Sequence, residues 1–379
     1  MPLYLTEEQT MLRDSARDFM AENAPPAALR ALRDQRSDDG FSRDLWAKFA
    51  DMGFTGVLVP EGHGGLGLGH VEAGVVMEQI GANLSASPLL ASGIAAVSLL
   101  KHAGSTAQQA AWLPRLATGE AIATIAVDEG RKHRPLHTAL RAEQQGGGWM
   151  LDGAKTFVLD GHVADAWLVV ARSAGQPGDA AGLSLFIVPR GTAGVAVERT
   201  VMVDAHNAAR LSFSHVTLPA DALLGTAGEG AAPLQAALDA GRAAAAAEAL
   251  GLAEEVFDRT VQYLKERKQF GKLIGEFQAL QHRAAHLYSE IEITRGAVLR
   301  AQQLLDEASP RAHEAVAVAK ARAGRTAARA VQEGVQMHGG MGMTDAFDIG
   351  LFMKRARVLD ELWGDANHQL DQFALGRGY

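Results

Sequence analysis

The first third of the chain has the hydrophobic spacing of amphipathic helices. Thr6–Gln9 has the pattern of a capping box, and apolar residues follow it at intervals of three and four. Two further helices are indicated, one through Leu45–Met52 that ends before Gly53 and one after a second capping box at Ser105–Gln108. We therefore predict an N-terminal helical domain over residues 1–120.

The middle of the chain changes to a period close to two. Glycine-containing turns separate the apolar runs, and no long helical segment connects them, which favours a mainly antiparallel sheet over a parallel one. Five runs are predicted as strands: 122–127, 149–151, 167–170, 183–188 and 211–213. This pattern predicts a β domain over residues 121–229.

Helical periodicity returns after Gly230 and continues to the end of the chain. Long helices are expected over 234–268, 276–308 and 311–338, and again from Ile349 onward. Helices of this length favour a bundle, which dimerisation could extend. The predicted fold is α+β and mainly α: a helical domain, a central antiparallel β domain, and a C-terminal four-helix bundle over residues 230–379.

Composition narrows the class of function. The 379 residues include 36 Lys and Arg against 44 Asp and Glu, a net charge of −8 that argues against nucleic acid or an anionic membrane as the main partner. There is no cysteine, which excludes thiolate catalysis, Cys-ligated zinc, iron–sulfur clusters and disulfides. His133 and His137 are four residues apart, but Pro135 between them argues against a helical metal pair, so we expect no metal.

The sequence carries no recognisable export or membrane signal. Met1–Glu8 lacks a basic start followed by an apolar run, and the uncharged stretch 79–100 is broken by polar residues and a proline. We expect a cytoplasmic protein without membrane insertion.

Three motifs make the helix–sheet–bundle prediction specific. Tyr263–His282 contains R-x-Q-F-G followed by F-Q and Q-H, Gln336–Thr344 contains Q-x-x-G-G-x-G, and Ser105–Glu120 resembles a hinge from a helical domain to a sheet. Taken in their order along the chain, the three motifs resemble those of the acyl-CoA dehydrogenase family over essentially the whole chain. The resemblance is greatest to the small or partner subunits of pimeloyl-CoA dehydrogenase-type bacterial enzymes. The resemblance implies FAD held between subunits and an electron-transfer flavoprotein as electron acceptor.

The same resemblance assigns residues to one half of an FAD site. An arginine can form a two-pronged contact with a diphosphate, and glycines let the backbone approach a phosphate closely. The residues that match the family's FAD contacts are Arg267, Gln269, Phe270, Gln278, Gln336, Met337, His338, Gly339 and Gly340. Alternative interpretations are a solvated charge run around Arg267, core packing for Phe270 and a glycine C-cap at Gly339.

The other half of the site departs from the family. Asp128–Pro135 stands where the family has a small Gly-Ser loop, and Phe157–Leu159 stands where it has a W-I-T-like strand. Leu159 has no hydroxyl to offer the flavin, and the basic side chains at 131, 132 and 134 do not resemble that loop. We therefore expect this chain to lack the usual seat for the isoalloxazine ring.

The catalytic base is also absent from its two usual positions. Removing an α-proton from a thioester requires a carboxylate with a raised pKa, but the aligned positions are Gly241 and Gly364. Asp365 and Asp239 are the candidate replacements. The first also fits a helix N-cap, and the second also fits an ion pair with Arg242 three residues on; both Asp239 and Arg242 match family positions that bind substrate.

These features predict a subunit of an FAD-dependent acyl-CoA dehydrogenase that completes a partner's FAD site and is itself weakly catalytic or silent. The substrate would be an acyl-CoA, and the partner a related subunit or a second copy. Two alternatives stay open: an autonomous homo-oligomeric dehydrogenase using Asp365 or Asp239, and a flavin-free scaffold or CoA-thioester-binding protein. Flavin content separates the three.

Overall fold

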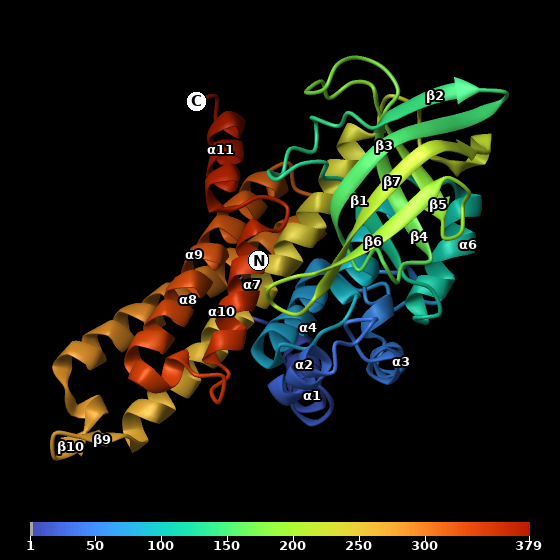
Figure 1. The fold of residues 1–379 in the computed structure, drawn as a ribbon. Helices are drawn as coiled ribbons and strands as arrows, with labels where there is room; N and C mark the ends of the chain where they lie inside the picture. Colours follow the sequence, from blue (N-terminus) through green and yellow to red (C-terminus); the bar gives the residue numbers. More distant parts are fainter. Residues whose placement is uncertain (1–2) are drawn as a thin grey trace. The chain divides into compact units, whose positions relative to one another are not determined.

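A computed structural model describes residues 3–379 (Figure 1). The chain forms two compact units, each assembled from separate stretches of sequence. One unit comprises Met1–Ala31, Gly69–Ala86 and Arg242–Tyr379, and the other comprises Leu32–Leu68 and Ser87–Gly241. These units are defined by packing and combine segments distant in the sequence, so they do not test a division into consecutive domains. The predicted three-domain division at residues 120 and 229 stays a prediction.

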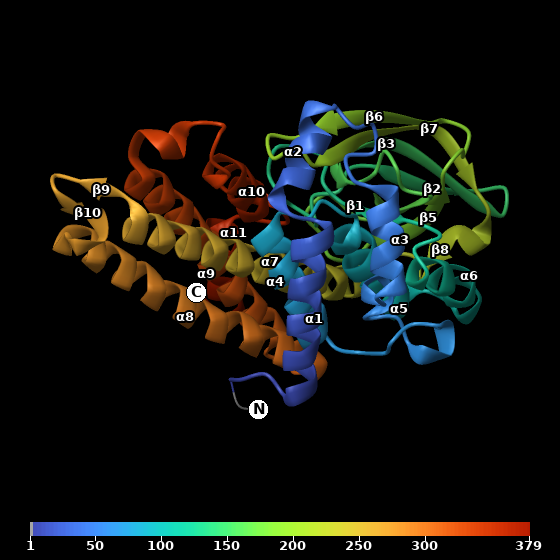
Figure 2. The ribbon, with the colours of Figure 1, turned by 90° about the horizontal axis from the view of Figure 1, so that it is seen from below.

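The first unit is helical. Its helices are α1 (Glu7–Asn23), α4 (His70–Asn83), the C-terminal part of α7 (Ala231–Glu266), α8 (Gln278–Asp306), α9 (Ala312–His338), α10 (Ile349–Glu361) and α11 (Ala366–Gly376). α9 packs against α8, α10 and α11, and α4 packs against α1 and α8. Figure 2 shows α8 beside the C-terminal part of α7. The capping box predicted at Thr6–Gln9 is present and starts α1.

Small residues let α4 and α7 approach until their backbones touch. A Cβ atom on Gly81 would lie 1.9 Å from the carbonyl oxygen of Glu248, and one on Gly251 would lie 1.9 Å from that of Glu78. Glycine is therefore required on both helices at this crossing, because any side chain there would overlap main-chain atoms.

The second unit contains the sheet. Its strands follow the order β6-β7-β3-β2-β4-β5-β8, and β1 pairs with β4. The strands are β1 (Ala123–Ala126), β2 (Arg141–Gln145), β3 (Gly148–Leu159), β4 (Ala166–Arg172), β5 (Leu183–Pro189), β6 (Val195–Val201), β7 (Asn207–Leu218) and β8 (Leu223–Leu224). Only the pairings of β4 with β1 and with β2 are parallel, so the predicted mainly antiparallel sheet is confirmed.

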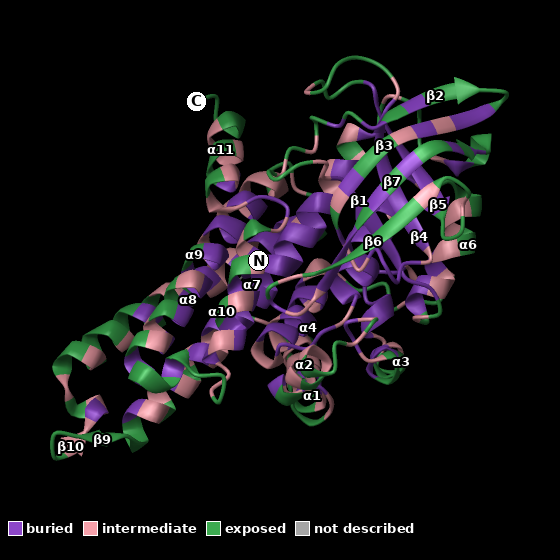
Figure 3. Ribbon diagram, viewed as in Figure 1, coloured by how far each residue is buried: buried purple, intermediate pink, exposed green. Residues whose placement is uncertain are grey.

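Burial explains which strands the hydrophobic pattern reveals. β4 is buried along its whole length and β5 except at Pro189, whereas the edge strand β6 is exposed from its second residue onward (Figure 3). Helices α3 (Arg43–Asp51), α5 (Val97–Ala103) and α6 (Thr106–Ala117) belong to the same unit, and the predicted capping box at Ser105–Gln108 starts α6. Across the described part of the chain, no helix combines the length and the apolar character needed to span a bilayer.

Candidate functional site

A tight hairpin joins α7 to α8 at one end of the helical unit (Figures 1 and 2). β9 (Lys268–Gln269) pairs with β10 (Lys272–Leu273), and the two residues between them, Phe270 and Gly271, have φ of 53° and 80°. Two successive left-handed residues are typical of a type I′ turn, which favours Asn-Gly. Phenylalanine costs about 1–2 kcal/mol in this conformation. The residue is 89% exposed, and its ring meets the Phe277 ring edge-on at 6.3 Å, so packing within this chain buries little of it.

The base of the hairpin is fixed by a small apolar cluster. Leu264, Ile274 and Met337 form it, with Tyr263, Phe277 and Leu280 packed against it. The amide of Ile274 donates to the carbonyl of Arg267 at 2.9 Å, which closes the loop. The hairpin therefore has a defined position relative to α7, α8 and the end of α9, although its tip is in solvent.

The polar side chains of this region are open to a ligand. Arg267, Gln269 and Gln278 are exposed, and within the described residues the Arg267 guanidinium has no hydrogen-bond or ion-pair partner. Gln278 is the first residue of the 29-residue helix α8, whose N-cap residue Phe277 supplies no side-chain acceptor. The first amides of α8 and the Arg267 cation thus both favour an anion at this end.

The glycine-containing turn after α9 contributes backbone rather than side chains. Gly339 has φ 62° and ψ −142°, which side-chain-bearing residues rarely adopt, and neither Gly339 nor Gly340 has an atom near its Cβ position. Of the predicted FAD contacts in this segment, Gln336, Gly339 and Gly340 are exposed, whereas Met337 and His338 are buried. The side chains of Met337 and His338 therefore support the turn from within.

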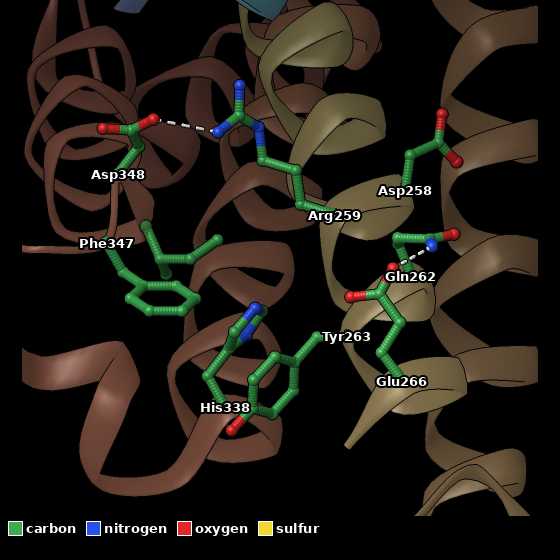
Figure 4. Close-up of a pocket in the computed structure, with 9 residues that line it drawn as sticks. Asp258, Arg259, Gln262, Tyr263, Glu266, His338, Phe347 and Asp348 are labelled. Atoms are coloured by element: carbon green, nitrogen blue, oxygen red, sulfur yellow. Dashed lines mark hydrogen bonds and ion pairs between the residues drawn. The ribbon is translucent and has the colours of Figure 1, made fainter. Parts of the chain in front are cut away.

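A cavity of about 610 Å³ lies beside the hairpin and the glycine turn (Figure 4). One wall is a stripe of α7, and the other comes from the end of α9 and the start of α10. Its lining residues are Asp258, Arg259, Gln262, Tyr263, Glu266, His338, Phe347, Asp348 and Ile349. The Tyr263 and His338 rings stack at 4.4 Å, and Phe347 meets both of them edge-on.

The cavity is rich in hydrogen-bond acceptors. Burial, with help from Glu254 and Glu255, raises the pKa of Asp258. Burial lowers the pKa of His338, whose Nδ1 lies 2.7 Å from the Gly334 carbonyl and donates to it in the neutral tautomer. Arg259 is already paired with Glu255 and with Asp348. A diphosphate would be repelled by this wall, so an anion is expected on the Arg267 side of the hairpin rather than in the cavity.

Gly364, which we align from the sequence with the family's base, is a glycine that the backbone requires. Gly364 has φ 104°, and a Cβ there would lie 2.3 Å from Cδ2 of His368 and 2.8 Å from Nε2 of Gln369. Buried donors hold the carbonyls around it: Nε of Arg242 donates to the Trp363 carbonyl at 3.0 Å, and Nε2 of Gln369 donates to both carbonyls at 3.1 and 3.2 Å.

Lys320 completes this set of donors from the middle of α9. Its ammonium donates to the carbonyls of Asp360 at 3.0 Å and Gly364 at 3.3 Å, and its side chain is 2% exposed. Burial lowers the pKa of Lys320 to about 8, against the opposing charge of Asp360. The side chains that contact the Trp363 and Gly364 carbonyls are therefore all donors, which position a peptide turn. The carboxylates of Asp360 and Asp365 act on Lys320 from the same region. The sequence carried a signal for Lys320, a lysine on the otherwise apolar stripe of α9.

The candidate replacement acids have structural partners. Asp365 is the N-cap of α11, and its Oδ1 accepts from the His368 amide at 2.8 Å, as its alternative interpretation predicts. Asp239 is buried on α7 and accepts from Nε2 of Gln235 at 2.8 Å. Glu248, further along α7, forms a buried ion pair with Nε of Arg355 at 2.6 Å. Each of these carboxylates thus has a partner within the fold: a helix amide, a glutamine amide or a buried arginine.

The segment aligned with the family's flavin-seating strand is the end of β3. Phe157 has φ 52° and is 55% exposed, and the register of β3 against β7 shifts between Lys155 and Val158. Leu159 is half-buried and pairs with Ala208. The side chain of Leu159 is aliphatic, so it offers no hydrogen bond to the edge of an isoalloxazine ring.

The preceding loop is folded on its own side chains. Asp128 pairs with Nδ1 of His133 at 2.9 Å, and Glu129 accepts from the amides of Ala139 and Leu140 and from the ammonium of Lys155. His133 is thus committed to Asp128. Within residues 3–379, no group of three or more His, Cys, Asp or Glu side chains is arranged to hold a metal ion.

Sequence profiles of known families match this chain in three consecutive blocks. The acyl-CoA dehydrogenase N-terminal domain matches residues 6–120, the middle domain residues 127–216, and the C-terminal domain residues 228–376. The chain belongs to the acyl-CoA dehydrogenase family. This assigns it to the FAD-dependent oxidoreductases that act on the CH–CH bond of an acyl-CoA, in agreement with the exposed, partnerless cation and the helix N-terminus at the hairpin, which fit the diphosphate of FAD.

Relatives and solved structures of the family match over nearly the full length. Cyclohex-1-ene-1-carbonyl-CoA dehydrogenase from Syntrophus aciditrophicus is 31% identical, covering 98% of this chain and 90% of the relative. Butyryl-CoA dehydrogenase from Megasphaera elsdenii is 26% identical with a TM-score of 0.90 over all of both chains. A crystal structure of the ChsE4-ChsE5 complex from Mycobacterium tuberculosis is 27% identical with a TM-score of 0.90, covering 100% and 99% of the two chains.

Proposed function

We propose that this acyl-CoA dehydrogenase family chain is a subunit of a hetero-oligomeric enzyme. It completes the FAD site of a related partner subunit and is itself weakly catalytic or silent. In the oxidation of an acyl-CoA to its 2,3-enoyl form, bound FAD supplies the hydride acceptor, and an electron-transfer flavoprotein would then take the electrons. The observation that carries the proposal is the left-handed Gly364, enclosed by Arg242, Lys320 and Gln369, at the position where the family has its base.

The exposed hairpin supports the first part of the proposal. Arg267 would contact the FAD diphosphate, Gln269 and Gln278 would donate hydrogen bonds to it, and Phe270 would pack against the dinucleotide. The backbone at Gln336 and at Gly339–Gly340 would approach the same group, with Met337 and His338 fixing the turn from below. An aromatic residue that is both strained and 89% exposed is what a surface completed by another chain would contain.

The surroundings of the candidate acids support the second part. A base for α-proton removal needs a desolvated carboxylate whose pKa is raised. Asp365 caps a helix, Asp239 accepts from Gln235 and Glu248 pairs with Arg355, so each carboxylate is stabilised in a structural role. We also propose that Asp239 and Arg242 contact the substrate, as their match to the family's substrate-binding positions predicts. A fold likeness to the ChsE4-ChsE5 complex, which joins two proteins, favours a related subunit as the partner.

The test is the flavin content of the chain with and without its partner. The chain purified alone should be colourless, and co-expression with a related acyl-CoA dehydrogenase subunit should give a yellow complex. Arg267→Ala should weaken FAD retention by the complex about tenfold to a hundredfold while assembly by size-exclusion chromatography is unchanged, because it removes one charge-assisted contact. Arg325→Ala, an exposed arginine without an ion pair in the described structure, is the matched control.

Two outcomes would contradict the proposal. An equimolar amount of FAD in the chain purified alone would show that it seats the flavin itself. If that flavin also bleached with an acyl-CoA, and Asp365→Asn or Asp239→Asn abolished the bleaching, the chain would be an autonomous enzyme. Absence of flavin from every complex would instead favour the scaffold or CoA-thioester-binding alternative.

A further inference from the structure

The loop between β1 and β2 turns its acidic residues inward and its basic residues outward. Asp128 is paired with His133, and Glu129 accepts three hydrogen bonds, including one from the fully buried Lys155 at 2.7 Å. Lys155 also donates to the carbonyl of Val127 at 2.9 Å. These contacts fix the ends of the loop, pair Glu129 with the Lys155 cation and leave Asp128 hydrogen-bonded to His133.

The three cations of this loop have no such partners. Arg131, Lys132 and Arg134, which we call the basic loop, are all exposed. Within residues 3–379 none of these three side chains forms a hydrogen bond or an ion pair. By contrast, the arginines beyond the loop on β2, β6 and β7, Arg141, Arg199 and Arg210, are each paired with a carboxylate. The three exposed side chains of the basic loop together carry a charge of +3, on a chain whose net charge is −8.

Exposed cations without ion pairs also lie close together at the hairpin, where Arg267 and Lys268 are adjacent in the described structure. Both ligands of the family's reaction are polyanions, because FAD carries a diphosphate and CoA carries a diphosphate and a 3′-phosphate. A protein of net charge −8 repels such groups on average, so binding requires local clusters of uncompensated cations. The hairpin supplies one cluster, and the basic loop supplies the second.

We propose that Arg131, Lys132 and Arg134 bind the phosphate groups of a CoA thioester. The inference rests on the proposed function only for the identity of the ligand, an acyl-CoA, and does not require the partner subunit. Arginine matches phosphate geometry with paired N–H groups, and lysine adds a point charge. Because Glu129 and Lys155 fix the loop in advance, little ordering is needed when the phosphates bind. Where the family has a small loop, this chain thus has a polyanion-binding one.

The test is calorimetric binding of CoA to the intact chain. Wild type should bind CoA more tightly than 3′-dephospho-CoA, and pantetheine, which carries no phosphate, should bind weakest. The triple variant Arg131→Ala/Lys132→Ala/Arg134→Ala should bind CoA about tenfold more weakly at 0.1 M salt, and its preference for CoA over 3′-dephospho-CoA should disappear. The matched control is Arg325→Ala/Arg329→Ala, which removes two unpaired exposed cations from α9 and should leave both affinities unchanged.

Three results would overturn the assignment. They are an unchanged CoA affinity in the triple variant, equal affinities of wild type for CoA and pantetheine, and absence of any CoA binding by wild type. Circular dichroism checks that the triple variant is folded. The single variant Arg134→Gln is a milder version of the test, since replacing one exposed side chain should not alter the fold. A triple variant that loses flavin from the complex instead of CoA affinity would assign the loop to FAD. Failure of the partner proposal would appear only in the Arg267→Ala flavin measurement.

Discussion

Replacing Gly364 by alanine should destabilise the protein far more than a buried methyl group normally does. The left-handed backbone at this residue costs a non-glycine residue about 1–2 kcal/mol. The new Cβ would also lie 2.3 Å from His368 and 2.8 Å from Gln369, and overpacking of this kind costs about 1–3 kcal/mol. A total of about 2–5 kcal/mol is a large share of the 5–15 kcal/mol typical of a domain.

The assay is thermal unfolding followed by circular dichroism, where this loss should lower the Tm by about 5–15 °C. Gly350→Ala is the matched control, because a Cβ at Gly350 on α10 meets nothing within 4 Å, and this change should be neutral or stabilising by up to about 1 kcal/mol. Gly364→Glu, which introduces a carboxylate at the aligned base position, should destabilise further and gain no dehydrogenase activity. A Gly364→Ala protein as stable as wild type, or an active Gly364→Glu protein, would refute the reasoning.

Three further predictions follow from buried charges and from the hairpin. Burial and Glu254 raise the pKa of Glu78 to about 7, so between pH 5 and 7 the folded state binds a proton that the unfolded state does not. Wild type should therefore lose stability relative to Glu78→Gln as the pH rises from 5 to 7. Parallel curves of Tm against pH for the two proteins would contradict this. Burial lowers the pKa of Lys320 to about 8, below its unfolded value, so wild type should gain stability relative to Lys320→Met between pH 8 and 10, checked by urea denaturation at each pH. Phe270→Gly should stabilise the isolated chain by up to about 1 kcal/mol because it relieves the left-handed strain, yet weaken flavin retention in the complex. A chain that is destabilised by this change would show that the edge-on contact with Phe277 outweighs the backbone strain.

Much of the fold could be predicted from the sequence because its signals are local. The capping boxes at Thr6 and Ser105 start helices where expected, and the predicted helix over 311–338 corresponds to α9, which spans Ala312–His338. Strands β4 and β5 are buried almost throughout, so continuous apolar runs reveal them. β2 and β6 were not predicted, because these strands are exposed at nearly every position and carry polar or charged residues, so they have no clear hydrophobic period.

The candidate site could be predicted only in part, for a related reason. Arg267 and Gly339 lie in short motifs whose letters identify the family. The donors that enclose Gly364 come from α7, α9 and α11, and no sequence separation connects Arg242, Lys320 and Gln369 until the helices pack. The burial of Met337 and His338 likewise depends on the cluster under the hairpin and on the stacking with Tyr263. Motifs identify which residues are present, while tertiary packing decides which of them face solvent.

The α4–α7 crossing limits how this protein can evolve or be engineered. At both Gly81 and Gly251 the obstructing atom is a main-chain carbonyl, so no second substitution can shrink the neighbour to make room for a larger residue. Paired substitutions in which one residue becomes larger and its neighbour smaller, a common way for protein interiors to change in evolution, are therefore not possible at this crossing. Homologous chains that keep the crossing should therefore retain both glycines together, and attempts to raise thermostability by replacing helical glycines with alanine should leave these two untouched.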